Sequence, residues 1–280
     1  MAWALGIAAA YMAAEFIGGL LANSLALLAD AGRMATDVAA LGLSLWAMRL
    51  AEKPATEERT YGYHRAEILA ALANGATLVA ISAYIFFEAY RRLLDPPDVV
   101  GPTMLAVATG GLIVNGIGVW LLHAGRKENL NVQGAWLHVV GDTLGSIGAI
   151  GGAVMVWAFG WRRADPIAGA LIGVLILYSS WNLLKESVNV LMASTPKGLD
   201  VPSIRSALCG VEGVTGVHDL HVWTLTSGVP LLTAHVDLGE SVDPQRVLQK
   251  LEGIARGKFG IAHSTFQIEA AGGEGCEPSL

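Results

Sequence analysis

The sequence predicts a membrane protein with an all-α bundle of six transmembrane helices, followed by a small cytosolic α+β domain. The chain of 280 residues is 53% hydrophobic and only 15% charged, whereas an ordinary soluble protein carries about 25% charged residues. The apolar residues gather into six runs, each long enough for the ~20 residues that a helix needs to cross a bilayer core. The mean hydropathy of +0.50 agrees with this class.

The six apolar runs follow one another with short polar breaks. The first run does not read as a signal peptide, because it lacks a basic N-terminal region and a second span follows directly after Asn23 and Ser24. We therefore assign residues 1–190 to a transmembrane domain. The runs are Ala2–Ala22, Ser24–Met48, Glu67–Ala89, Pro102–His123, Val132–Phe159 and Ala164–Leu184.

Residues 196–270 differ from the preceding part, because none of their apolar runs is long enough to span a membrane. Turn and helix-start residues divide this region in the order αββαβ, which predicts a small antiparallel sheet with helices on one face. The glycine-rich tail, 271–280, is expected to be mobile. The predicted helices are Val201–Leu208 and Pro244–Arg256, and the predicted strands are Val214–Leu225, Leu231–Leu238 and Ser264–Glu269.

The distribution of Lys and Arg predicts the orientation in the membrane. Seven basic residues fall on one side of the predicted spans and four on the other, which places both chain ends in the cytoplasm of a cell whose plasma (inner) membrane holds the protein. Unpaired Cys209 and Cys276 agree with a reducing compartment. The net charge of −6 leaves no basic patch for nucleic acid. The seven are Arg49, Lys53, Arg59, Arg65, Arg126, Lys127 and Lys185, against Arg91, Arg92, Arg162 and Arg163.

Ionisable residues interrupt two of the apolar runs at helical spacing. Asp30, Arg33 and Asp37 share one face of the second run, and His138 and Asp142 share one face of the fifth. Ionisable groups at bilayer depth are costly, so each indicates a site. Imidazole with carboxylate suits Zn²⁺, whereas carboxylates alone favour harder ions. The alternative for His138 and Asp142 is a hydrogen bond that packs two helices together.

Other ionisable residues lie in or near the spans. Glu88 and Asp165 fall close to a membrane surface, where we expect structural roles. Glu15 is either a packing carboxyl or part of a proton route.

Four motifs resemble the cation diffusion facilitators, and within that family the zinc-transporter branch. The resemblance implies a homodimer formed through the cytosolic domains and the membrane helices, with six helices per protomer and a metallochaperone-like cytosolic domain. It also implies efflux of Zn²⁺ in exchange for protons. The motifs are SLALLADAGRMATD at 24–37, YGYHRAEIL at 61–69, LHVVGD at 137–142 and HDLHVWTL at 218–225.

By that resemblance, the transport site comprises residue 33, Asp37, His138 and Asp142, but the family has His where this chain has Arg33. Arginine has no lone pair to offer a metal. Three interpretations remain open. Arg33 turns away and water or Asp30 completes the site, or Arg33 acts as a tethered cation that silences transport, or the substrate is a different ion.

Coulomb repulsion bears on these three interpretations. Repulsion between an arginine and a divalent ion ~4 Å apart amounts to several kcal/mol at an effective dielectric constant near 20. This cost favours the tethered cation for the isolated site, while the resemblance favours a metal transporter as the overall role.

The resemblance also implies metal positions in the cytosolic region. His64 and His263 would lie near the boundary of membrane and domain and could share an ion. A second site would comprise His218, His235 and Glu269, with Cys276 as a possible further ligand. Without the resemblance, the spacing favours ordinary strand residues on a solvated face for His218 and His235. His123 and His221 are expected to be structural or solvated, and Cys209 a small core residue.

The predicted mechanism is alternating access, in which the ligands bind Zn²⁺ when deprotonated and protons from the outer side displace it. A second class is a non-transporting regulatory subunit, whose cytosolic domain senses zinc. A third class, an intramembrane hydrolase, is disfavoured because the chain has no Gly-x-Ser-x-Gly and no His-Glu-x-x-His motif. We therefore expect a transporter and not an enzyme.

Overall fold

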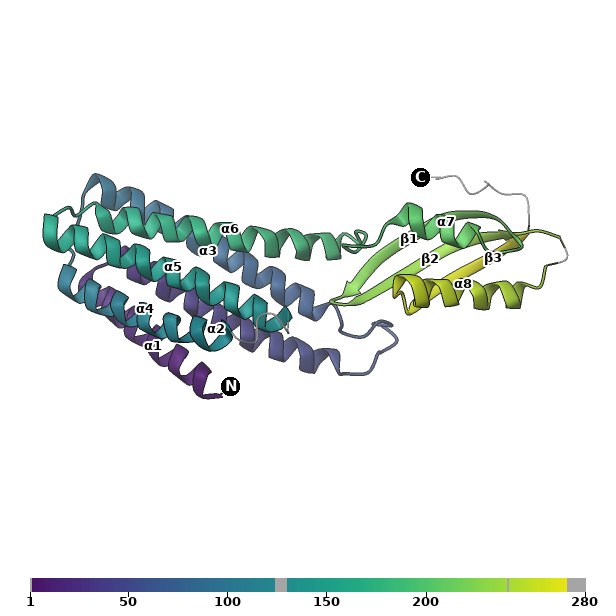
Figure 1. Cartoon of the computed structure of the whole chain (residues 1–280), viewed down its shortest axis with the longest axis horizontal. Coiled ribbons are helices and arrows are strands. Elements are labelled where there is room, and N and C mark those ends of the chain that lie inside the picture. Colours follow the sequence, from purple (N-terminus) through teal and green to yellow (C-terminus); the bar gives the residue numbers. More distant parts are fainter. Residues whose placement is uncertain (1, 124–129, 241, 271–280) are drawn as a thin grey trace. The chain divides into compact units, whose positions relative to one another are not determined.

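The computed structural model describes residues 2–123, 130–240 and 242–270 (Figure 1). It divides into two units. One comprises residues 1–45 and 71–184, and the other comprises residues 46–70 and 185–280.

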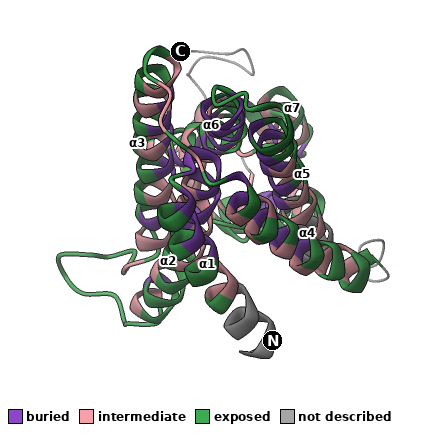
Figure 2. Ribbon diagram, turned by 90° about the vertical axis from the view of Figure 1, so that its left-hand side faces the viewer, coloured by how far each residue is buried: buried purple, intermediate pink, exposed green. Residues whose placement is uncertain are grey.

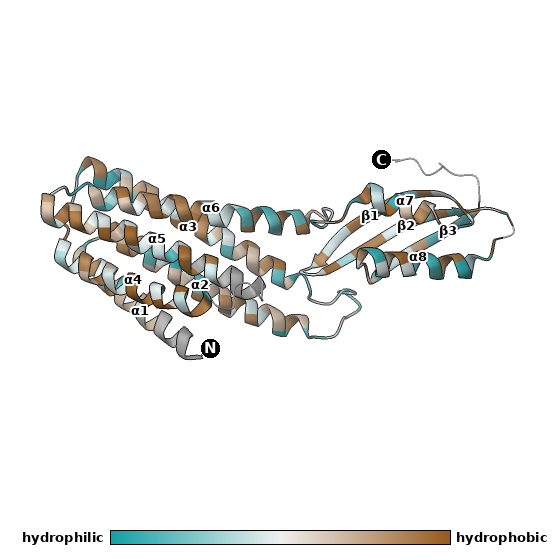
Figure 3. Cartoon of the chain, viewed as in Figure 1, coloured by the Kyte–Doolittle hydropathy of each residue, from teal (hydrophilic) through white to brown (hydrophobic). Residues whose placement is uncertain are grey.

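Six long helices account for the N-terminal two thirds of the chain, as the sequence predicts. Within the described residues, four helical stretches are long and apolar enough to cross a membrane: α3, α4, Val139–Phe159 of α5, and α6. α2 has the length but carries Asp30, Arg33 and Asp37, and α1 contributes an apolar stretch at Ala9–Ala22. Figure 3 shows the hydrophobic colouring along these helices. Their bounds are α1 Ala2–Ala22, α2 Leu25–Ala51, α3 Ala66–Leu94, α4 Gly101–His123, α5 Leu130–Phe159 and α6 Ala164–Leu191.

Small residues hold the membrane helices together, and large apolar residues point away from them. Alanines dominate the buried cluster, and Figure 2 shows the buried faces turned inward. Trp120 is 75% exposed, as suits a side chain that faces lipid. Close approach of two helices depends on Gly101, because a Cβ there would come within 2.7 Å of the Trp157 Cβ.

A buried carboxylate fixes the start of α2. Asp165, at the start of α6, accepts hydrogen bonds from the Ser24 hydroxyl (2.6 Å) and from the backbone N–H of Leu25 (2.8 Å). Arg92 lies 3.9 Å from the same carboxylate and donates to Glu88 at 2.9 Å. An anion at a helix N-terminus satisfies amides that have no partner within the helix. Asp165 and Glu88 thus have the structural roles that the sequence predicts.

The C-terminal part folds as the predicted αββαβ unit, with the strands in the order β1-β2-β3. Asp200 caps the first helix by accepting from the Ser203 N–H at 3.0 Å, and Gly260 ends the second in a left-handed conformation, with φ of 67°. Hydrogen bonds from Ser203 lower the pKa of the Asp200 carboxyl. The elements are α7 Val201–Cys209, β1 Val214–Thr226, β2 Val229–Leu238, α8 Pro244–Phe259 and β3 His263–Ala270.

The prediction of a wholly antiparallel sheet is wrong. β1 and β2 form an antiparallel hairpin, but β3 pairs with β2 in parallel. The reason is the connection, because α8 returns the chain along the sheet before β3 begins, as in any β-helix-β crossover. One face of the sheet packs on α7 and α8 through residues such as Val217, Val236 and Leu251, all fully buried. Strand alternation therefore leaves His235 on the other face.

We predict that Asp165→Ala destabilises the membrane unit. The substitution removes the acceptor of buried hydrogen bonds at the start of α2, at a cost of about 2 kcal/mol. Thermal unfolding in detergent should occur several degrees lower than in the unmodified protein. Asp98→Ala is the control, because Asp98 is 85% exposed in its ion pair with Arg162 and should contribute little. Equal melting temperatures for the two variants would contradict the capping role.

Candidate metal sites

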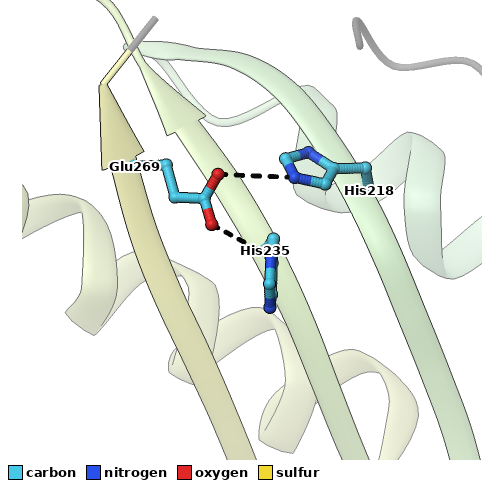
Figure 4. Close-up of side chains that lie close together, drawn as sticks. All are labelled: His218, His235 and Glu269. Carbon is cyan, nitrogen blue, oxygen red and sulfur yellow. Dashed lines mark ion pairs between the residues drawn. The ribbon is translucent and has the colours of Figure 1, made fainter. Parts of the chain in front are cut away.

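The C-terminal sheet brings together two imidazoles and a carboxylate that the resemblance assigns to one metal site. His218 of β1 pairs directly with His235 of β2. Glu269 of β3 reaches both, with Oε2 lying 3.5 Å from His218 Nε2 and Oε1 lying 3.0 Å from His235 Nδ1 (Figure 4). The three side chains are partly buried, and their ligand atoms all lie within 4.8 Å of one another. Nitrogen and oxygen donors at this spacing fit a zinc ion.

A β-bulge places the histidines of β1. The register shifts between His218 and His221, and Asp219 there adopts a φ of 48°. His218 pairs with His235, and His221 pairs with Thr233, two residues away on β2. The bulge therefore puts both histidines of β1 on one face, although a regular strand would put them on opposite faces. His221 is exposed and lies 2.9 Å from Asp219, as expected for a solvated residue.

Two aspartates support the cluster, and the sequence reasoning missed both. Asp237 is 3% exposed and lies 3.6 Å from His218 Nδ1, while Asp219 lies 3.6 Å from His235 Nε2. Carboxylates behind ligand histidines orient the rings and set their tautomers. His218 Nδ1 and Asp237 Oδ1 are both buried without a hydrogen-bond partner, as in a site built around an additional group. The signal for Asp237 was its position two residues after His235, on the same strand face.

A pocket in the same unit contains the other predicted pair, His64 and His263. It has a volume of about 280 Å³, and both His64 and His263 line it, together with Leu231. The rings of Tyr61 and His263 meet edge to face with centroids 6.2 Å apart. Among the described residues, no third His, Cys, Asp or Glu joins this pair in a cluster. A shared ion here would need water as a further ligand.

The same unit holds a polar clamp that the sequence reasoning did not identify. Glu67, in the first turn of α3, accepts hydrogen bonds from the hydroxyls of Thr226 (2.7 Å) and Ser227 (3.0 Å). These two residues form the end of β1 and the start of the turn into β2. The β1–β2 turn is therefore tied to the start of α3.

In the membrane unit, α2 and α5 bring opposite charges together. The Arg33 guanidinium forms an ion pair through Nη2 with the Asp142 carboxylate, and its Nε lies 3.7 Å from Asp30. Asp30 is 2% exposed. Asp37 lies one turn beyond Arg33 and is half-buried. The side chain of His138 lies outside the described residues, so the ligand set that includes it stays a prediction.

Gly141 and Gly145 of α5 lie beside these groups. A Cβ at residue 141 would lie 3.9 Å from Arg33 Nη1, and one at residue 145 would lie 3.4 Å from Asp30 Oδ1. Nearby, Glu15 of α1 is buried, and its carboxylate lies 3.2 Å from the Tyr11 hydroxyl. The α2–α5 contact is therefore shaped around charged side chains.

The cysteines require one correction. Cys209 packs against the domain core as expected, but it is disulfide-bonded and does not have the free thiol that the sequence predicts. Cys276, the predicted additional ligand, lies outside the described residues.

Comparison with known proteins decides the family. Residues 1–192 match the cation efflux transmembrane domain, and residues 196–271 match the cation efflux protein cytoplasmic domain. The chain belongs to the cation diffusion facilitator family. It is therefore a multi-pass membrane protein with a cytoplasmic-type C-terminal domain.

Several members of the family are similar along most of the chain. A cadmium, cobalt and zinc/H(+)-K(+) antiporter of Bacillus subtilis is 44% identical, with 92% of this chain and 85% of that protein aligned. The CzcD metal cation efflux protein of Cupriavidus metallidurans is 42% identical over 96% of this chain and 85% of its own. Zinc transporter ZitB of Escherichia coli is 42% identical over 95% of this chain and 86% of its own.

A solved structure of the metal-bound C-terminal domain of CzcD from Cupriavidus metallidurans is 39% identical to this chain. It covers 25% of this chain and 99% of its own, with a TM-score of 0.25.

We predict that Glu67→Ala loosens the β1–β2 turn. The change removes the acceptor of two hydroxyl hydrogen bonds, which contribute about 1–3 kcal/mol together. Backbone amides at 226–230 should exchange with deuterium about tenfold faster, as measured by mass spectrometry. Glu57→Ala, in the exposed loop before α3, is the control and should leave exchange unchanged. Unchanged exchange in both variants would show that Glu67 does not hold the turn.

Proposed function

We propose that the chain is a zinc efflux transporter that exchanges Zn²⁺ for protons by alternating access. The observation that carries this proposal is the meeting of Asp30 and Asp142, from two helices, on one cationic group inside an apolar bundle. A buried arrangement of this kind is suited to accept a cation. The relatives named for zinc, cadmium and cobalt support a divalent ion.

The proposed transport ligands are Asp37, His138 and Asp142, with Asp30 or water completing the set. Carboxylate and imidazole must be deprotonated to bind Zn²⁺, so proton arrival from the outer side releases the ion. Zinc is preferred over harder ions because the set includes an imidazole. The antiporter name of the Bacillus subtilis relative supports proton exchange.

The cytosolic domain is proposed to bind zinc as a regulator. His218, His235 and Glu269 would hold the ion, and His64 with His263 would share another. The proposed assembly is a homodimer in the plasma membrane, with both termini in the cytoplasm. Zinc bound to the two cytosolic domains would draw them together and bias the transport cycle.

The ion pair of Arg33 with Asp142 favours one alternative, a regulatory family member that does not transport. In that case the arginine permanently replaces the membrane ion, and only the cytosolic domain binds zinc. Transport measurements on the purified protein separate the two functions.

We predict Zn²⁺ flux in proteoliposomes that depends on a pH gradient and falls at least tenfold in Asp142→Asn. The substitution removes a charged ligand that the proposed site cannot replace. A fluorescent zinc indicator inside the vesicles measures the flux. Asp98→Asn, at an exposed aspartate, is the control. Flux that is absent from the unmodified protein, or equal in Asp142→Asn, would rule out transport through this site.

We further predict that His235→Ala removes one bound zinc per protomer, as measured by isothermal titration calorimetry on the full chain. The loss of one imidazole leaves too few ligands to compete with water. His221→Ala is the matched control, because it removes a neighbouring exposed histidine of the same sheet face. Equal zinc content in the two variants would contradict the cluster.

A further inference from the structure

In the membrane unit, the Asp142 carboxylate forms an ion pair with the protein's own guanidinium. Arg33 contacts Asp142 across the helix interface and Asp30 three residues back along α2, and its side chain is 12% exposed. Gly141 of α5 lies beside the guanidinium, at van der Waals distance from Nη1. The guanidinium of Arg33 is therefore paired with Asp142, which is one of the proposed ligands of the transported ion.

We propose that Arg33 is a tethered competitor of the transported metal ion. Metal binds to Asp142 only after the guanidinium has left it, and Asp30 holds the guanidinium in the displaced position. The inference rests on the proposed transport function and deepens it, because it names the residue that sets the metal affinity of the membrane site.

Charge makes the competition unavoidable. Arginine stays protonated at any accessible pH, so its cation cannot be removed by deprotonation. A divalent ion and the guanidinium repel each other at contact distance, and the repulsion is strong where little water screens it. The two cations therefore exclude each other from one carboxylate.

Asp30 is placed to receive the displaced group. Its carboxylate is buried, and Arg33 Nε already lies 3.7 Å away, so a small side-chain rotation exchanges one partner for the other. The i,i+3 spacing on α2 keeps both groups on one helix face. A buried carboxylate without a cation is costly, which favours retention of the guanidinium beside Asp30 when metal takes Asp142.

Zinc titration of the detergent-solubilised full chain tests the proposal. The membrane-site contribution is defined as the binding that disappears in Asp142→Asn. Arg33→Gln removes the competitor without adding a strong ligand, so this contribution should tighten by at least about tenfold, as expected from the lost repulsion. Arg33→Lys keeps the charge, so its membrane site should bind zinc as weakly as that of the unmodified protein. Arg91→Gln removes an arginine that is 67% exposed and should change nothing.

A double-mutant cycle separates the holding role of Asp30 from a ligand role. Asp30→Asn should weaken membrane-site binding in the unmodified chain, because the guanidinium loses its alternative partner. The same change should have no effect once Arg33→Gln has removed the guanidinium. A structural ion pair without competition would give no gain of affinity in Arg33→Gln, and Asp30 acting as a ligand would weaken binding in both backgrounds.

Zinc binding to the cytosolic cluster, retained in each variant, shows that the protein is folded. If Arg33→Gln does not fold, Arg33→Leu replaces it as the charge-removing variant, because leucine also offers no metal ligand. No gain of affinity on removal of the charge overturns the proposal, even if the unmodified protein transports zinc through Asp142. The expected order of affinities without any flux supports the competition and contradicts the transport function instead.

Discussion

The arrangement of the membrane unit depends on the pairing of charge where water is scarce. Asp30, Arg33 and Asp142 lie among small apolar residues, and none of the three could be buried there at reasonable cost without an opposite charge. The pairing fixes how α2 lies against α5, because one side chain must reach both carboxylates. Gly141 and Gly145 of α5 lie at van der Waals distance from Arg33 and Asp30.

The two units differ in which apolar side chains they bury and which they expose. The membrane helices bury alanines and present residues such as Trp120 and Phe159 outward, because lipid does not penalise exposed apolar surface. The C-terminal unit buries Val217, Val236 and Leu251 between sheet and helices. Its polar groups can consequently gather on the opposite sheet face, where His218 and His235 are accessible to ions from solution.

The sequence predicts local features well in this chain. The six helices and the αββαβ order follow from apolar periodicity and from capping residues such as Asp200, which act within one turn of the chain. Features that depend on distant segments were missed. The parallel pairing of β3 depends on the path of α8, and the clamp of Glu67 on Thr226 joins residues that are 159 positions apart.

In the candidate site of the C-terminal sheet, features that depend on distant segments were again the ones missed. His218, His235 and Glu269 follow from the family resemblance, whereas Asp237 and Asp219 were missed because their roles depend on strand register and on the bulge. The bulge also decides the direction in which His221 points. Without it, the alternation of β1 would have put His218 and His221 on opposite faces.

The two candidate sites differ in what a metal ion must displace. The C-terminal cluster is partly exposed, with His235 at 31% and Glu269 at 32%, so water screens the imidazole–carboxylate pairs that an ion must separate there. At the membrane site, an ion must separate Arg33 from Asp142 in a setting that screens charge poorly. Under the proposed function, we therefore expect the C-terminal cluster to fill at the lower metal concentration. A domain that fills first reports rising zinc before the membrane site is loaded, and this order is what a sensor of transport demand requires.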